Sequence, residues 1–135
     1  MPSRAAVAAL LAAAALASAC SRAPPPKPAE RGAQLYVTNC MACHQKQGEG
    51  VAGLQPPLSG TPVPNGDPAV LAAWVMFGTR PSALPRGHYA NVMPQFAYLS
   101  DADLAALLSY VRGSFGNHAD AVTPDLIAGV RAAQR

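Results

Sequence analysis

One short motif constrains this chain more than any other feature: residues 40–44 read C-M-A-C-H. Residues three apart share one face of a helix, so the thiols of Cys40 and Cys43 are expected side by side, with the His44 imidazole directly after them. Cysteines this close occur in a disulfide, in a zinc site, or as the two attachment points of a haem. The only other cysteine is Cys20, which leaves too few for a fold held together by disulfides.

Haem attachment explains the motif better than zinc binding does. A structural zinc ion takes four ligands, so the motif would need about two more, and His88 and His118 would have to converge on it. C-x-x-C-H is instead the complete attachment motif of c-type haem, in which two thiolates add to the vinyl groups and the histidine ligates the iron. We therefore expect one covalent haem c, held by Cys40, Cys43 and His44.

The first 29 residues predict an export signal followed by a tether. Arg4 precedes the apolar run Ala5–Ala17, and small residues follow at 18 and 19, which is the pattern of a secretory signal peptide. The run is shorter than the ~20 residues of a transmembrane helix. Prolines crowd residues 21–29 and favour an extended linker. The expected organisation is a signal peptide at 1–19, a linker at 20–29 and one domain at 30–135.

The end of the signal region bears on where the protein resides. The segment Leu16–Cys20 reads L-A-S-A-C and resembles the lipobox of bacterial lipoproteins, whose cysteine is acylated. The resemblance implies a lipid on Cys20 and a membrane anchor on the periplasmic side of the bacterial inner membrane. Ordinary cleavage near Ala19 is the alternative, and it would leave a soluble periplasmic protein.

Within the domain, four groups of residues follow a recognisable spacing: Gly32, Tyr36 and Cys40; Pro56, Leu58 and Gly60; Met93, Pro94, Gln95 and Phe96; Leu107, Tyr110 and Val111. From Glu30 to about Arg112 the chain resembles a class I cytochrome c. This resemblance implies an all-α fold of three to five helices wrapped around one haem. It also implies that the Pro56 carbonyl accepts a hydrogen bond from His44 and that Leu58 packs on the haem. Residues 115–117 and 122–124 further resemble cytochrome modules of membrane-bound dehydrogenases.

Local signals agree with a helical domain that has no sheet. Asp67 can cap a helix that stops before Gly78, and the dipeptide at 65–66, Asn-Gly, predicts a turn in front of it. Ser100 begins a helix with a capping-box-like start, and Thr123 precedes a proline that opens the last one. With apolar periodicity, the expected helices cover about 30–42, 68–77, 101–112 and a short stretch from 124.

Four side chains are candidates for the second axial ligand of the iron: Met93, Met76, His88 and His118. Met93 precedes a proline, which pushes its backbone toward extended geometry and places it in a loop that can be aimed at the iron. Met76 lies in the middle of an expected helix, where core packing explains it. His88 fits a surface histidine, and His118 follows the matched region. We therefore predict Met93 as the ligand opposite His44, a pair that raises the reduction potential.

Other residues carry weaker functional claims. Trp74 is expected to pack in the core or at the haem edge rather than to relay electrons. Arg80 and Arg86 can neutralise haem propionates, although solvated loop charges explain them equally well. Tyr89 and Asn91 fall just before the methionine loop, where they can hydrogen-bond to it or to a propionate.

Composition excludes several functions. The chain has 10 Lys and Arg against 7 Asp and Glu, with a formal net charge of +3, and its basic residues are scattered, which argues against a nucleic-acid-binding face. No carboxylate pair, Ser/His/Asp set or glycine-rich phosphate loop is visible, so no enzyme site is predicted.

These features favour an electron carrier over an enzyme. The expected partners are redox proteins such as a dehydrogenase, a cytochrome bc complex or a terminal oxidase or reductase. One rival is a permanent electron-transfer subunit of a dehydrogenase or reductase complex. Another is a haem-based gas sensor, which would require an open position on the iron.

Overall fold

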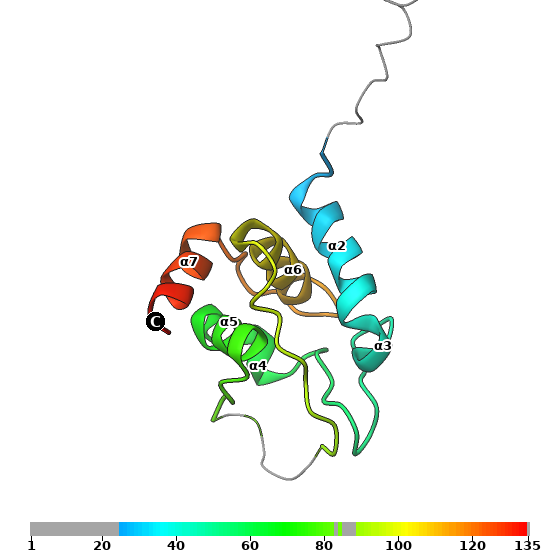
Figure 1. Cartoon of the computed structure of the whole chain (residues 1–135). Helices are drawn as coiled ribbons and strands as arrows, with labels where there is room; N and C mark the ends of the chain where they lie inside the picture. Colours follow the sequence, from blue (N-terminus) through cyan, green and yellow to red (C-terminus); the bar gives the residue numbers. More distant parts are fainter. Residues whose placement is uncertain (1–24, 83, 85–88, 135) are drawn as a thin grey trace, which may run out of the picture.

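A computed structural model describes residues 25–82, 84 and 89–134, and this part of the chain is helical with no strand. Six helices follow one another (Figure 1): α2 (Pro28–Asn39), α3 (Met41–His44), α4 (Pro62–Asn65), α5 (Pro68–Phe77), α6 (Asp101–Gly113) and α7 (Pro124–Ala132). The all-α fold predicted from the sequence is confirmed. Within the described ranges, no helix combines the length and hydropathy that a membrane span requires.

Three of the predicted helix boundaries are confirmed by their caps. The Asp67 side chain accepts a hydrogen bond from the Ala69 amide at 2.7 Å, and Gly78 ends α5 with a φ of 74°, which favours glycine. Ser100 caps α6 and Thr123 caps α7 in the same way, each accepting from the amide three residues later. These helix ends depend on neighbouring residues alone, which is why the sequence reveals them.

Two local expectations were wrong in detail. The single helix expected over 30–42 is interrupted at Cys40, whose φ of −120° bends the chain between α2 and α3. The amides of Cys43 and His44 both turn back to the Cys40 carbonyl, at 3.1 and 2.8 Å. A short helix, α4, also precedes the turn expected at 65–66. At this bend the two motif cysteines differ in burial: Cys40 is partly buried, whereas Cys43 in α3 is exposed.

Helix α6 is the centre of the fold and contacts both α2 and α7 (Figure 1). One hydrophobic cluster joins α5, α6 and α7, and contains the completely buried Met76, Leu104 and Ile127. A second cluster joins α2 to the end of α6 through Tyr36, Leu107 and neighbouring side chains. The helices thus leave a space between α3, α5 and the segment that precedes α6.

Gly32 lets α2 and α6 approach closely. A Cβ atom at this position would lie 2.8 Å from the Tyr110 Cβ and would overlap the Ala106 carbonyl oxygen. Backbone atoms cannot yield as a flexible side chain can, so the two helices would have to separate. The glycine in the cytochrome-like spacing therefore has a packing role.

Gly32→Ala is expected to lower the free energy of unfolding of the haem-loaded protein by about 1–3 kcal/mol through overpacking. Gly129→Ala in α7 is the matched control, since nothing lies within 4 Å of the added methyl; it should raise stability by up to about 1 kcal/mol. Denaturant unfolding measures both. Equal effects of the two substitutions would contradict the close-contact explanation.

Candidate functional site

His44 is held in one orientation by the loop that follows it. Its Nδ1–H donates a hydrogen bond to the Pro56 carbonyl at 2.9 Å, and the residue is 6% exposed. Burial lowers the pKa of His44, with the Pro56 carbonyl opposing this shift, so the neutral ring is favoured. With Nδ1 engaged, Nε2 is the nitrogen left for a metal ion, and its lone pair is available in the neutral form.

The two motif cysteines differ in their surroundings. Cys40 is half-buried, and burial, with a contribution from Cys43, raises the pKa of its thiol to about 12. Cys43 is exposed. Neither thiol is in a disulfide, and among the described residues no group of three or more His, Cys, Asp or Glu side chains is placed to hold a metal ion.

An apolar pocket with a cavity volume of about 130 Å³ opens beside His44 and Cys40. Its walls come from the loop after α3, from α4, and from α5 and α6. The side chains that line these walls include Pro56, Pro57, Leu58, Pro62, Val63, Pro64, Leu71, Trp74, Val75, Leu107, Leu108 and Val111. Both Pro56 and Leu58, predicted from the resemblance to contact the cofactor, lie in this wall.

A second, wider pocket of about 420 Å³ adjoins the first and shares lining residues with it: Cys40, His44, Pro56, Trp74, Leu84, Tyr89 and Met93. The exposed Cys43 lies at this wider part. Its outer wall is formed by the segment that runs from Ala90 to Phe96 in front of α5.

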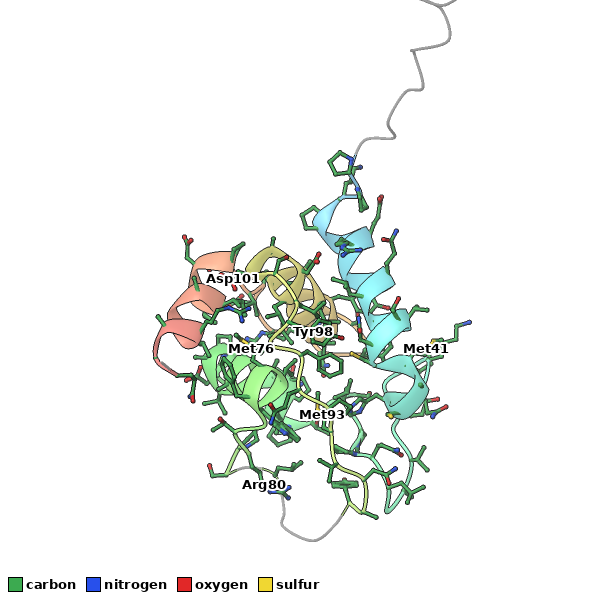
Figure 2. The ribbon with its side chains drawn as sticks, viewed as in Figure 1. Met41, Met76, Arg80, Met93, Tyr98 and Asp101 are labelled. Carbon is green, nitrogen blue, oxygen red and sulfur yellow. The ribbon has the colours of Figure 1, made fainter. Side chains whose placement is uncertain are left out.

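Met93 is the methionine that lines the same pockets as His44. Figure 2 shows it on the segment that leads up to α6, between α5 and α3. Met76 is completely buried in the α5–α6–α7 cluster and lines neither pocket, in agreement with its expected place in the core. Met41, the first residue of α3 (Figure 2), lines neither pocket and packs against the cluster between α2 and α6.

The structure describes one of the two histidine candidates, His118. His118 is exposed and lines neither of the two pockets. His88 lies outside the described residues, as do Arg86 and Cys20. Met93 therefore remains the predicted second ligand.

The described residues with weaker functional evidence in the sequence line the wider pocket. Trp74 lines both pockets from α5, and Arg80, Tyr89 and Asn91 line the wider one. The Asn91 amide donates to the Leu54 carbonyl at 3.2 Å, which joins the loop after α3 to the segment before Met93. The indole of Trp74 is therefore a wall of the pocket, as the packing interpretation predicts.

Sequence reasoning missed two polar side chains near the site. The Gln55 side-chain oxygen is buried without a hydrogen-bond partner among the described residues, and Gln55 lines the wider pocket. Asn117 is 1% exposed, and its amide donates to the carbonyls of Leu58 and Val111 and accepts from Gly60 and Asn65. Its position in a cytochrome-like tripeptide was noted, but nothing local predicts these distant partners.

The cytochrome c family model matches residues 29–114. The chain is a member of the cytochrome c family. A cytochrome c subunit of a quinone-dependent alcohol dehydrogenase from Gluconobacter oxydans (strain 621H) is 39% identical over 90 residues, 65% of this chain and 19% of that subunit. The gluconate 2-dehydrogenase cytochrome c subunit of Pantoea cypripedii is 34% identical over 106 residues, 76% of this chain and 24% of that subunit.

A relative of similar size also exists. Cytochrome c-552 of Thermus thermophilus is 32% identical over 91 residues, which cover 64% of this chain and 69% of that protein. The chain thus spans about a fifth to a quarter of the dehydrogenase subunits but most of a small cytochrome.

As a cytochrome c, this protein carries one covalent haem c, and the described residues fit that group. The pocket walls are apolar, the neutral imidazole of His44 borders them, and the unpartnered side-chain oxygen of Gln55 can accept a hydrogen bond from a polar group in the wider pocket. When bound, the haem supplies one-electron oxidation and reduction at its iron. Cys40 and Cys43 would supply the two thiols for attachment, His44 would supply an imidazole oriented by Pro56, and the pocket walls would exclude water.

Proposed function

We propose that this cytochrome c is a one-electron carrier whose haem is attached through Cys40 and Cys43 and ligated by His44 and Met93. The observation that carries the proposal is that His44 and Met93, from separate segments, line the same apolar pocket. Two protein ligands fill both axial positions and leave no place for a substrate or a gas. The pair also favours a raised reduction potential.

Two measurements on the purified haem-loaded protein test this function. Voltammetry should show one reversible one-electron couple, and the reduced protein should not bind carbon monoxide. Carbon monoxide binding to the wild type would favour the gas-sensor function instead, because it requires an open iron.

A permanent electron-transfer subunit is the second candidate function. It is supported by the relatives, which are cytochrome subunits of alcohol and gluconate dehydrogenases. A carrier and a subunit differ in whether a dehydrogenase stays bound. Purification from native membranes under mild conditions separates them, since a subunit will co-purify with its dehydrogenase in a fixed ratio.

We further propose that Cys20 is lipidated and holds the domain on the periplasmic side of the inner membrane. The lipobox-like segment and the proline-rich residues after it support this proposal. Two or three acyl chains make such an anchor durable, whereas one chain binds only marginally. Anchoring raises the concentration of the domain next to membrane-bound redox partners.

Cys20→Ser is expected to move the protein from the membrane fraction to the soluble periplasmic fraction while its haem is retained. Fractionation followed by haem staining measures this. Wild-type protein recovered entirely in the soluble fraction would contradict lipidation and favour cleavage near Ala19.

Electron transfer is expected to depend modestly on charge near the haem motif. Lys46 is exposed and follows His44 by two residues, so Lys46→Glu should slow association with an acidic partner several-fold, since charge acts mainly on the association rate. Stopped-flow kinetics at several ionic strengths measures it. Lys27→Glu is the matched control, with the same charge change on an exposed residue before α2. Electron-transfer rates that change neither with ionic strength nor in Lys46→Glu would indicate that the redox partner binds through an apolar surface or remains permanently bound.

A further inference from the structure

Arg131 of α7 reaches out of its own helix to the segment that leads from Met93 to α6. Its guanidinium donates to the Ala97 carbonyl at 2.7 Å and to the Leu99 carbonyl at 3.0 Å. It also forms an ion pair with Asp101 at 2.9 Å. Figure 2 shows Asp101 near α7, where α6 begins. Three acceptors within five residues of chain are thus held by one side chain.

This segment is also attached to the core at Phe96. The Phe96 amide donates to the Val75 carbonyl at 2.9 Å, and the Phe96 ring is 6% exposed in the α5–α6–α7 cluster. Ile127 belongs to the same cluster and is completely buried. Because residues four apart share one face of a helix, Ile127 and Arg131 present one side of α7 to the segment and the cluster beneath it.

Arg131 lies outside the part of the chain that matches the cytochrome c family model. The family match ends at residue 114, and the whole of α7 follows it. Among the described residues no backbone amide donates to the Ala97 or Leu99 carbonyl, so the guanidinium supplies their hydrogen bonds. An arginine suits this place because its planar fork offers several donors with fixed directions, which a lysine cannot match.

We propose that Arg131 is a positioning residue for Met93: by fixing residues 97–101, it holds the methionine loop against the pocket and stabilises ligation by Met93. This rests on the proposed ligation of the haem by Met93. Without the two carbonyl contacts, the segment keeps its Phe96 anchor and the Tyr98–Asn39 hydrogen bond. It loses its attachment to α7, however, and the methionine loop gains freedom to move. Met93 then competes less well with an added ligand, although the covalent attachment and His44 are unaffected.

The experiment is a titration of the oxidised, haem-loaded full chain with imidazole, which competes with Met93 for the iron. Arg131→Met keeps much of the aliphatic part of the side chain and removes the guanidinium group. Loss of its charge-assisted hydrogen bonds should raise the apparent imidazole affinity by about tenfold. Arg131→Lys should give an intermediate value, and it serves as the second variant if Arg131→Met does not fold.

Two controls separate positioning from general stability. Asp101→Asn removes the ion pair but keeps both carbonyl contacts, so its imidazole affinity should stay near that of the wild type. Arg31→Met breaks a comparable pair, Arg31–Asp103 at 2.7 Å, between α2 and α6. It should affect denaturant unfolding but leave imidazole affinity unchanged.

The possible outcomes test the role of Arg131 separately from the proposed ligation of the iron by Met93. A wild type with the weak red absorption band of an iron–sulfur bond, together with Arg131 variants of unchanged imidazole affinity, would overturn the inference alone. An equal gain in affinity in Arg31→Met would also overturn it, since general loosening would then be the cause. A wild type without that band, whose spectrum persists in Met93→Ala, would overturn the Met93 ligation and this inference with it.

Discussion

Replacing Cys40 and Cys43 together with alanine is expected to abolish covalent haem and the folded state at once. Without haem, the apolar walls of the pocket, which include Leu58, Leu71 and Leu108, would face water or an empty cavity of about 130 Å³. An unfilled core cavity costs about 24 cal/mol per Å³, so the void alone would remove about 3 kcal/mol. The walls would also lose the burial that the haem provides, and the combined loss is large against the total stability of about 5–15 kcal/mol that a domain possesses. Haem staining after denaturing electrophoresis and far-ultraviolet circular dichroism measure the two losses.

Met41→Ala is the matched control for this double substitution. Met41 lies between the two cysteines in the sequence but lines neither pocket, so the variant should keep its covalent haem. A cysteine-free variant that is folded without haem would contradict the prediction, because it would mean that the helices close the pocket by themselves.

Met93→Ala is expected to open the iron of the haem-loaded protein. The weak red band of the iron–sulfur bond should disappear from the oxidised spectrum, the reduction potential should fall, and the reduced protein should gain carbon monoxide binding. The physical reason is that Met93 lines the pocket next to His44, and loss of a thioether ligand removes its preference for reduced iron. Optical titration and voltammetry measure these changes.

Met76→Ala makes the same chemical change at a site that is completely buried in the core. It should lower the free energy of unfolding by about 2–5 kcal/mol through cavity formation while the red band is retained. The two variants thus have opposite signatures, one spectral and one energetic. Loss of the band in Met76→Ala, with the band intact in Met93→Ala, would reverse the ligand assignment.

The helix ends illustrate how far local reasoning reaches. Asp67, Ser100 and Thr123 each bond to an amide two or three residues away, so the start of each helix was predictable from its immediate neighbours. The bend at Cys40 was not, because it depends on how the chain after His44 folds back. The amide of Gly50 bonds to the His44 carbonyl at 3.0 Å, and Pro56 then accepts from the His44 ring.

The attachment chemistry was determined by the sequence alone. Two thiols and an imidazole within five residues are a covalent pattern that needs no tertiary contact to be recognised, and the cysteine count leaves few alternatives. The function class followed from the same motif. The roles of side chains that contact distant segments could not be predicted from the sequence, because those contacts depend on where the helices cross.

Only the tertiary structure decided which polar and sulfur-containing side chains serve the site. The sequence favoured Met93 over Met76 as a ligand, but only the structure shows Met76 buried in the core from α5 and Met93 brought to the pocket by the loop before α6. Asn117 and Arg131 act on chain segments more than 30 residues away. Such long-range contacts cannot be recognised from neighbouring residues in the sequence. They form only when α2 and α7 pack against α6, and tertiary packing supplies most of the stability of helices in proteins.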